Sequence, residues 1–275
     1  MSRFSDRSSG SRLSLALGIT AAAIAPFLSS APSSAASVFS DTRGHWARPF
    51  IETLGQENVV SGFPDGTFKP DQPVTRAQFA AIVRQAFNEN AVRQARGFKD
   101  IPVNHWASAA IKEAYETGFM TGYPNSLFQP NLEIPKVQVL VSLASGLRYT
   151  PTRPAATDLK AYTDAGEIPD YATNGVAATT EKNIVVNYPN VKFLNPNETA
   201  TRGDVAAFIY QALVNEGEFK PIANVEEAAQ YIVRGTSSGS TSNTTTNSNP
   251  TNQNPTNQNG ELKVAQGTKL NVKYP

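Results

Sequence analysis

The chain repeats its own sequence at a fixed interval, and this feature limits the folds open to it most strongly. Its two tryptophans, Trp46 and Trp106, lie 60 residues apart, and each directly follows a histidine. The same interval relates the segment 62–70, GFPDGTFKP, to the segment 122–130, GYPNSLFQP. Such a period is typical of a repeat protein, in which each unit buries its apolar face only against its neighbours.

A third and weaker copy follows the first two. The segment 162–164, YTD, corresponds to 39–41, FSD, and the pair 201–202, TR, corresponds to the identical pair 75–76. One unit of this size buries too little apolar surface to fold alone, whereas three can share one core. We therefore expect three repeat units, at 37–97, 98–157 and 158–218.

Each unit has the pattern of a helix, an irregular loop and a second helix. In the second helices apolar residues recur three and four positions apart. The predicted faces are Phe79, Ile82, Val83, Ala86 and Phe87, then Leu140, Leu143, Ala144 and Leu147, then Val205, Phe208, Ile209, Ala212 and Leu213. Thr75 can cap its helix in a capping box with Gln78, whereas Pro135 predicts a different start in the second unit. The predicted fold is all-α, with pseudo-threefold character.

Residues 1–36 have the features of a secretory signal peptide. Three arginines precede an uncharged apolar stretch of 16 residues, 13–28, and small residues follow it. That stretch is shorter than the roughly 20 residues that span a bilayer, although a retained membrane anchor is the alternative. We predict cleavage after Ala36 and an exported mature chain without a membrane span.

The C-terminal part differs in composition from the repeats. A short terminal helix is predicted at 219–234. Residues 235–260 contain no charged and no aromatic side chain, which predicts a disordered linker. Residues 261–275 alternate apolar and polar side chains, as a strand does. We interpret this tail as the start of a truncated β-domain or as an edge strand for a protein partner.

Composition excludes several kinds of site. Without cysteine, the chain has no disulfide, no thiolate metal site and no cysteine nucleophile. Its two histidines cannot form a three-histidine metal site, and a net charge of +1 argues against nucleic-acid binding. The HExxH, GxSxG and GxxxxGK[ST] motifs are absent from the sequence. We therefore expect a protein that is not an enzyme and needs no cofactor.

Taken together, the repeated motifs resemble the S-layer homology (SLH) domain, which usually occurs in three tandem copies. The family pattern combines F-x-D, W-A, G-[YF]-x-D-G-T-F-x-P and T-R-A-[EQ]. The first unit has nearly all of it and ends with TRAQ at 75–78; the second has PKVQ at 135–138 and the third TRGD at 201–204. The resemblance covers roughly 39–215.

This resemblance implies a three-pronged helical fold that binds cell-wall polymers noncovalently in grooves between the prongs. The ligand it implies is peptidoglycan or a polysaccharide linked to it, often pyruvylated, and the location is the periplasm or the cell surface. Two alternatives stay open. The chain is a structural protein that binds another envelope protein through its repeats and C-terminal strand, or it is the anchor of a longer protein.

A basic residue follows the cap position of each second helix. Arg76, Lys136 and Arg202 lie where the helix dipole disfavours a cation. A ligand carboxylate, such as that of a pyruvyl ketal, would resolve this conflict if free N–H groups and the cation converged on it. Arginine can bind a carboxylate in a bidentate way, so the two arginines are predicted to be the stronger anchors. Alternatively, Arg76 pairs with Asp41 or Asp71 and holds the units together.

Other candidates for glycan binding have competing structural roles. Trp46 and Trp106 can stack on a sugar ring, but their helical spacing favours the core. Gly62 and Gly122 supply a backbone conformation that other residues resist, or let a ligand approach closely.

Three aspartates and two histidines complete the repeated polar positions. Asp41, Asp100 and Asp164 are expected to cap the turn that follows each of them more often than to bind ligand. His45 and His105 are expected at helix starts, as caps or surface groups.

Overall fold

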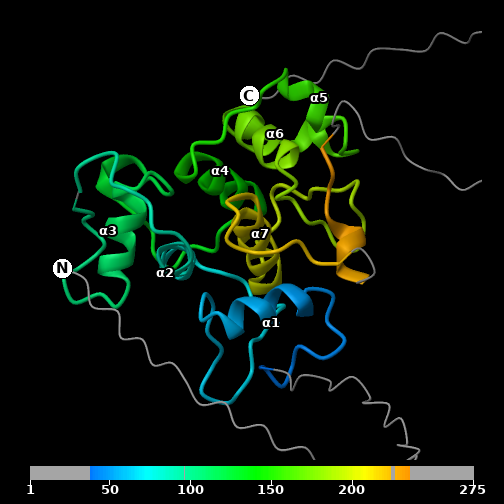
Figure 1. The fold of residues 1–275 in the computed structure, drawn as a ribbon. Helices are drawn as coiled ribbons and strands as arrows, with labels where there is room; N and C mark the ends of the chain where they lie inside the picture. Colours follow the sequence, from blue (N-terminus) through cyan, green and yellow to red (C-terminus); the bar gives the residue numbers. More distant parts are fainter. Residues whose placement is uncertain (1–37, 96, 224–226, 236–275) are drawn as a thin grey trace, which may run out of the picture. The chain divides into compact units, whose positions relative to one another are not determined.

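The structure, a computed structural model, describes residues 38–95, 97–223 and 227–235 (Figure 1). Its helices are α1 (Arg48–Gln56), α2 (Arg76–Ala86), α3 (Ser108–Glu116), α4 (Lys136–Gly146), α5 (Ala155–Leu159), α6 (Thr173–Glu181) and α7 (Arg202–Asn215), with 3-10 turns η1 (Pro124–Ser126), η2 (Ala165–Glu167), η3 (Asp170–Ala172) and η4 (Glu227–Tyr231). The described residues form isolated β-bridges but no strand, which confirms the all-α prediction for them. None of these helices is long and apolar enough to cross a bilayer.

Several predictions fall on other residues. The signal peptide with its cleavage after Ala36, the linker beyond residue 235 and the strand at 261–275 lie outside the described residues. The predicted terminal helix is represented by the short 3-10 turn η4 rather than by an α-helix.

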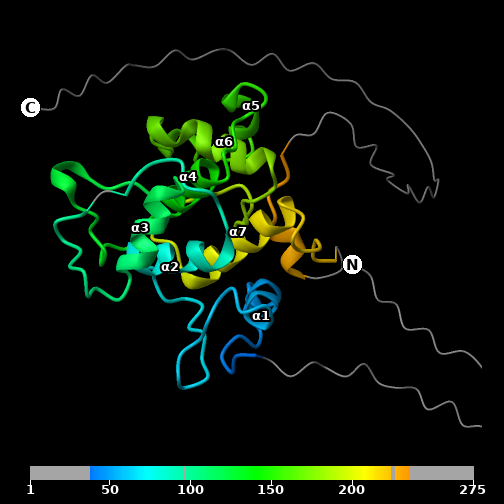
Figure 2. The ribbon, with the colours of Figure 1, turned by 60° about the vertical axis from the view of Figure 1, so that its left-hand side comes forward.

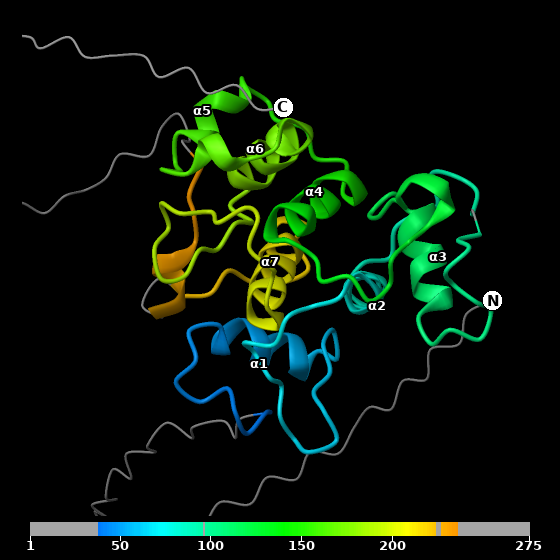
Figure 3. The same cartoon turned by 180° about the vertical axis from the view of Figure 1, so that it is seen from behind.

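Helices pair across the repeats rather than within them. The second helix of one unit packs on the first helix of the next, which gives the pairs α2 with α3, α4 with α6, and α7 with α1. The last pair joins the third unit back to the first, and α7 lies between α1 and α4 in the three views (Figure 1, Figure 2 and Figure 3). The units therefore interlock, and each depends on its neighbours for a buried face.

The second helices begin at equivalent residues but not with equivalent caps. Thr75 and Gln78 form the predicted capping box of α2, and Thr201 and Asp204 form another at α7. Pro135 gives α4 no side-chain cap, as predicted. All members of the apolar faces predicted for α4 and α7 are buried; in α2, Phe79 and Val83 are buried and Phe87 follows the helix in the core.

Three backbone hydrogen bonds close a ring at the centre of the repeats. Val74 donates to the carbonyl of Ala200 at 3.0 Å, Ala200 to Ile134 at 2.9 Å, and Ile134 to Val74 at 2.9 Å. Each residue precedes the cap position of a second helix, and all three are buried. The predicted pseudo-threefold character is thus built into the backbone.

The first two N–H groups of each second helix extend this ring. In α2 they bind the carbonyls of Leu132 and Pro130, in α4 those of Glu198 and Pro196, and in α7 those of Gln72 and Pro70, at 2.8–3.1 Å. Helix N–H groups at these positions have no partner within their own helix. Here the carbonyls of every unit accept the first N–H groups of the second helix in the unit before it.

The repeated aspartates fix the loops. Asp41 accepts the N–H groups of Phe68 and Lys69, both at 2.7 Å. Asp100 and Asp164 make the equivalent pairs of bonds in their own units. The expectation that these aspartates cap the next turn is therefore wrong, because their partners are loop residues 27–31 positions further along.

The loop shape that the repeats share also explains why glycine stands at positions 62 and 122. Neither Gly62 nor Gly122 has a positive φ, so the predicted need for an unusual backbone conformation is wrong. A Cβ atom on Gly62 would lie 2.5 Å from both the ring of Phe39 and the carbonyl oxygen of Thr67. A Cβ on Gly122 would meet the ring of Phe98 at 2.3 Å. The glycines let an aromatic ring, buried at Phe39 and half-buried at Phe98, pack directly on the loop.

We predict that Gly62→Ala destabilises the protein by about 1–3 kcal/mol, because the aromatic ring and the loop must move apart. Chemical denaturation followed by circular dichroism measures this change. The matched control is Gly97→Ala, where a Cβ meets nothing within 4 Å. Equal stability of the two variants would contradict the close-packing explanation.

Candidate functional site

Arg76 and Lys136 line separate cavities between repeat units, and Arg202 makes the equivalent contact between the third unit and the first. Arg76, Lys136 and Arg202 are the first residues of α2, α4 and α7, as predicted. We name the grooves the Arg76 groove, the Lys136 groove and the Arg202 groove. The predicted binding residues are therefore distributed over equivalent positions and do not form one joint site.

In the Arg76 groove, the guanidinium reaches across to the second unit. Its Nε donates to the carbonyl of Phe128 at 2.8 Å, and its Nη2 to the carbonyl of Thr121 at 2.7 Å. Its Nη1 lies 3.5 Å from the amide oxygen of Gln138. The ring of Tyr123 lies 4.7 Å from the guanidinium carbon. These contacts join two units. Because Arg76 is only 5% exposed, it forms part of the groove wall.

A cavity of about 330 Å³ opens beside this guanidinium, a volume within the range of small-ligand sites. Its lining includes Gly122, Tyr123, Gln138, Ser142, Ser145 and Tyr171. Tyr171 comes from the third unit and is 63% exposed. The cavity thus combines a cation, amide and hydroxyl groups and an accessible aromatic ring.

The Arg202 groove repeats the contacts of the first arginine. Nε of Arg202 donates to the carbonyl of Phe68 at 2.7 Å, and Nη2 to the carbonyl of Ser61 at 2.8 Å. The ring of Phe63 lies 5.1 Å from the guanidinium carbon. In the repeat, Trp106 corresponds to the exposed tyrosine of the first cavity, and it is 66% exposed. A core role for Trp106 is therefore wrong.

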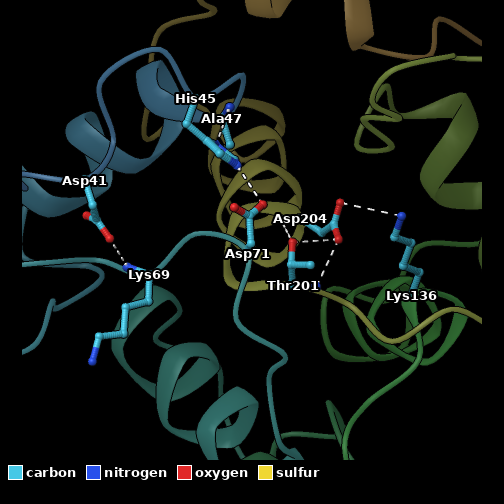
Figure 4. A network of polar contacts seen from close by, with 8 residues as sticks. All are labelled: Asp41, His45, Ala47, Lys69, Asp71, Lys136, Thr201 and Asp204. Atoms are coloured by element: carbon cyan, nitrogen blue, oxygen red, sulfur yellow. Dashed lines mark hydrogen bonds and ion pairs between the residues drawn. The ribbon is translucent and has the colours of Figure 1, made fainter.

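The Lys136 groove has a different charge arrangement. The Nζ of Lys136 lies 3.6 Å from a carboxylate oxygen of Glu198 and 3.7 Å from one of Asp204. Figure 4 shows Lys136 directed toward Asp204, which also binds Thr201. Trp46, half-buried before the start of α1, lines this groove together with Lys136. The cation here is already paired with acidic groups of the third unit.

Neither arginine has an ion pair in the part of the chain that the structure describes. Burial lowers the pKa of Arg76, while Tyr123 and Asp100 act in the opposite direction. Burial likewise lowers the pKa of Arg202, against the effect of Asp41. An arginine keeps its charge in proteins, and a buried charge is costly unless an opposite charge compensates it.

Two parts of the sequence interpretation do not agree with this geometry. The first N–H groups of the helices are not free for a ligand, because carbonyls of the next unit accept them. Arg76 pairs with neither predicted aspartate: Asp41 holds its own loop, and Asp71 lies 3.1 Å from Nε2 of His45. Arg76 does join two units, but through backbone carbonyls.

The histidines lie at helix starts, as predicted. Nδ1 of His45 accepts the N–H of Ala47, and Nδ1 of His105 accepts the N–H of Ala107, both at 3.1 Å.

Sequence reasoning did not select all the residues that line the Arg76 cavity. It missed Gln138, Ser142, Ser145 and Tyr171. Gln138 and Tyr171 had usable signals, because Gln138 ends the repeated motif at 135–138 and Tyr171 occupies the repeat position of the two tryptophans.

Comparison with known proteins supports the family resemblance. A family model described as the S-layer homology domain matches residues 38–80, 97–134 and 161–206. An amylopullulanase of Thermoanaerobacterium thermosulfurigenes is 29% identical over 65% of this chain and 10% of its own length. A cellulosome-anchoring protein of Acetivibrio thermocellus is 31% identical over 47% of this chain and 30% of its own length. A surface-layer 125 kDa protein of Lysinibacillus sphaericus is 25% identical over 81% of this chain and 18% of its own length.

The match thus spans less than a third of the length of each of these relatives. The three segments that the family model matches all fall in the repeat region. The chain therefore contains three tandem S-layer homology domains and belongs to that family.

Proposed function

We propose that the three repeats anchor the protein noncovalently to the bacterial cell wall by binding an acidic polysaccharide linked to peptidoglycan. The protein is then exported and associated with the cell wall. The repeats bind the polysaccharide and catalyse no reaction. The chain is similar to proteins named as cellulosome-anchoring and surface-layer proteins, which supports this role.

The observation that carries the proposal is a buried guanidinium that has no ion pair within the described residues and lies beside an exposed aromatic ring. Arg76 and Tyr171 make this arrangement in one groove, and the half-buried Arg202 and the exposed Trp106 hold the same positions of the repeat. A buried cation of this kind gains from a ligand carboxylate, and the guanidinium has more N–H donors than its protein contacts use.

Sugar chemistry fits the rest of the Arg76 cavity. An aromatic ring offers a flat apolar face to the C–H groups of a sugar, and Tyr171 presents such a ring. Ser145 and Gln138 supply hydroxyl and amide groups for sugar hydroxyls. A pyruvyl ketal on the sugar would present its carboxylate to the guanidinium of Arg76.

The exposed rings offer a test that leaves the interlocking arginines intact. We predict that Tyr171→Ala and Trp106→Ala each weaken binding to protein-free cell walls by about tenfold, or about 1.4 kcal/mol. Co-sedimentation of the full chain measures the change. Phe193→Ala is the matched control, because this aromatic ring is 42% exposed and does not line the Arg76 cavity. Full binding by the Tyr171→Ala, Trp106→Ala double variant would rule out these grooves.

The chemical nature of the ligand has its own test. Cell walls stripped of their secondary glycan by acid should no longer sediment the protein, since the carboxylate that the arginines bind is removed. Untreated walls from the same preparation serve as the control. Equal sedimentation with both walls would show that peptidoglycan itself, and not the attached glycan, is the ligand.

A further inference from the structure

The three grooves differ in what covers the aromatic side chain at their edge. In the Arg76 and Arg202 grooves, the loop aromatics Tyr123 and Phe63 lie over the guanidinium. In the Lys136 groove, the corresponding residue is Tyr188, and it stacks instead on Trp46, with ring centroids 5.3 Å apart and planes 3° apart. One face of this tryptophan is therefore already in contact with a ring of the same chain.

The segment around η4 adds a second cover. The ring of Tyr231 meets Trp46 edge-on at 6.3 Å and Tyr188 at 4.9 Å. Backbone bonds hold this segment to the third unit: Asn187 donates to the carbonyl of Tyr231 at 2.9 Å, and Val233 donates to Val185 at 2.8 Å. The aromatic cover is thus part of the folded structure.

Charge opposes an acidic ligand at the same place. Glu198 and Asp204 both lie near the amine of Lys136, and Asp71 also lines the groove. Asp204 is nearly buried, so its repulsion of a ligand carboxylate is weakly screened. The arginines of the other two grooves have no such carboxylate in an ion pair within the described residues.

We propose that the chain itself occupies the aromatic position of the Lys136 groove and that the anchor binds acidic glycan through only the Arg76 and Arg202 grooves. Tyr188, Tyr231 and Asp204 determine this selectivity: the two rings occupy the sugar-stacking position and the carboxylate neutralises the cation. This inference rests on the proposed function and specifies which of its sites operate. Tyr231 then joins residues 227–235 to the aromatic edge of the Lys136 groove.

The chain has only two tryptophans, so each can be followed separately. Trp46 lines the Lys136 groove, and Trp106 is exposed at the repeat position that Tyr171 holds beside the Arg76 cavity. In the full chain, Trp106→Phe leaves Trp46 as the only fluorophore of its kind, and Trp46→Phe leaves Trp106. We expect acrylamide to quench Trp46 several-fold less than Trp106. Soluble glycan released from protein-free walls should change the emission of Trp106 saturably and leave that of Trp46 unchanged. A saturable response of Trp46 at the same glycan concentration would overturn the proposal while leaving wall binding intact.

A matched pair of tyrosine variants gives a second readout. Tyr188→Ala should raise the acrylamide quenching of Trp46 and leave wall binding at the wild-type level, whereas Tyr171→Ala weakens it about tenfold. Circular dichroism verifies that both variants are folded. Loss of wall binding in folded Tyr188→Ala would show that the Lys136 groove is a working site and overturn the proposal. If the wild-type chain binds neither walls nor soluble glycan, the proposed function fails and this inference fails with it.

Discussion

The ring of backbone hydrogen bonds among Val74, Ile134 and Ala200 is the constraint on which the rest of the structure depends. Each of its members sits just before the cap of a second helix, so closing the ring brings three helix starts together. The next unit then accepts the first N–H groups of each helix. These groups have no partner inside their own helix. The repeats therefore supply hydrogen-bond acceptors to one another in a cycle. No single repeat contains both the donors and the acceptors that it needs.

This interlocking places the arginines in two roles at once. Arg76 and Arg202 donate to loop carbonyls of the following unit and thereby hold the units together. The same contacts fix each guanidinium at a groove wall, so little side-chain freedom is lost when a ligand binds there. The cost is a charge without an ion pair among the described residues, buried at Arg76 and half-buried at Arg202, which an acidic ligand would offset. Binding of such a ligand should therefore also stabilise the contact between repeats.

Much of the local structure could be predicted from the sequence. The capping box of Thr75 and Gln78, the apolar face of α7 and the position of each cation at a helix start follow from spacing alone. The pairing of helices across units could not be predicted, because an apolar face shows that a helix is buried but not which helix buries it. The same limit explains the errors over free N–H groups and over Trp106. Its spacing suggested a core position, whereas α3 begins two residues later and the ring is exposed.

The central claim is that acidic wall glycan binds at Arg76 and Arg202, neither of which has an ion pair among the described residues. A crystal structure of the chain with soluble wall glycan tests it most directly. The account predicts a glycan carboxylate within hydrogen-bonding distance of the guanidinium groups of Arg76 and Arg202, with a sugar ring on Tyr171 and on Trp106. Glycan bound away from both arginines would contradict it.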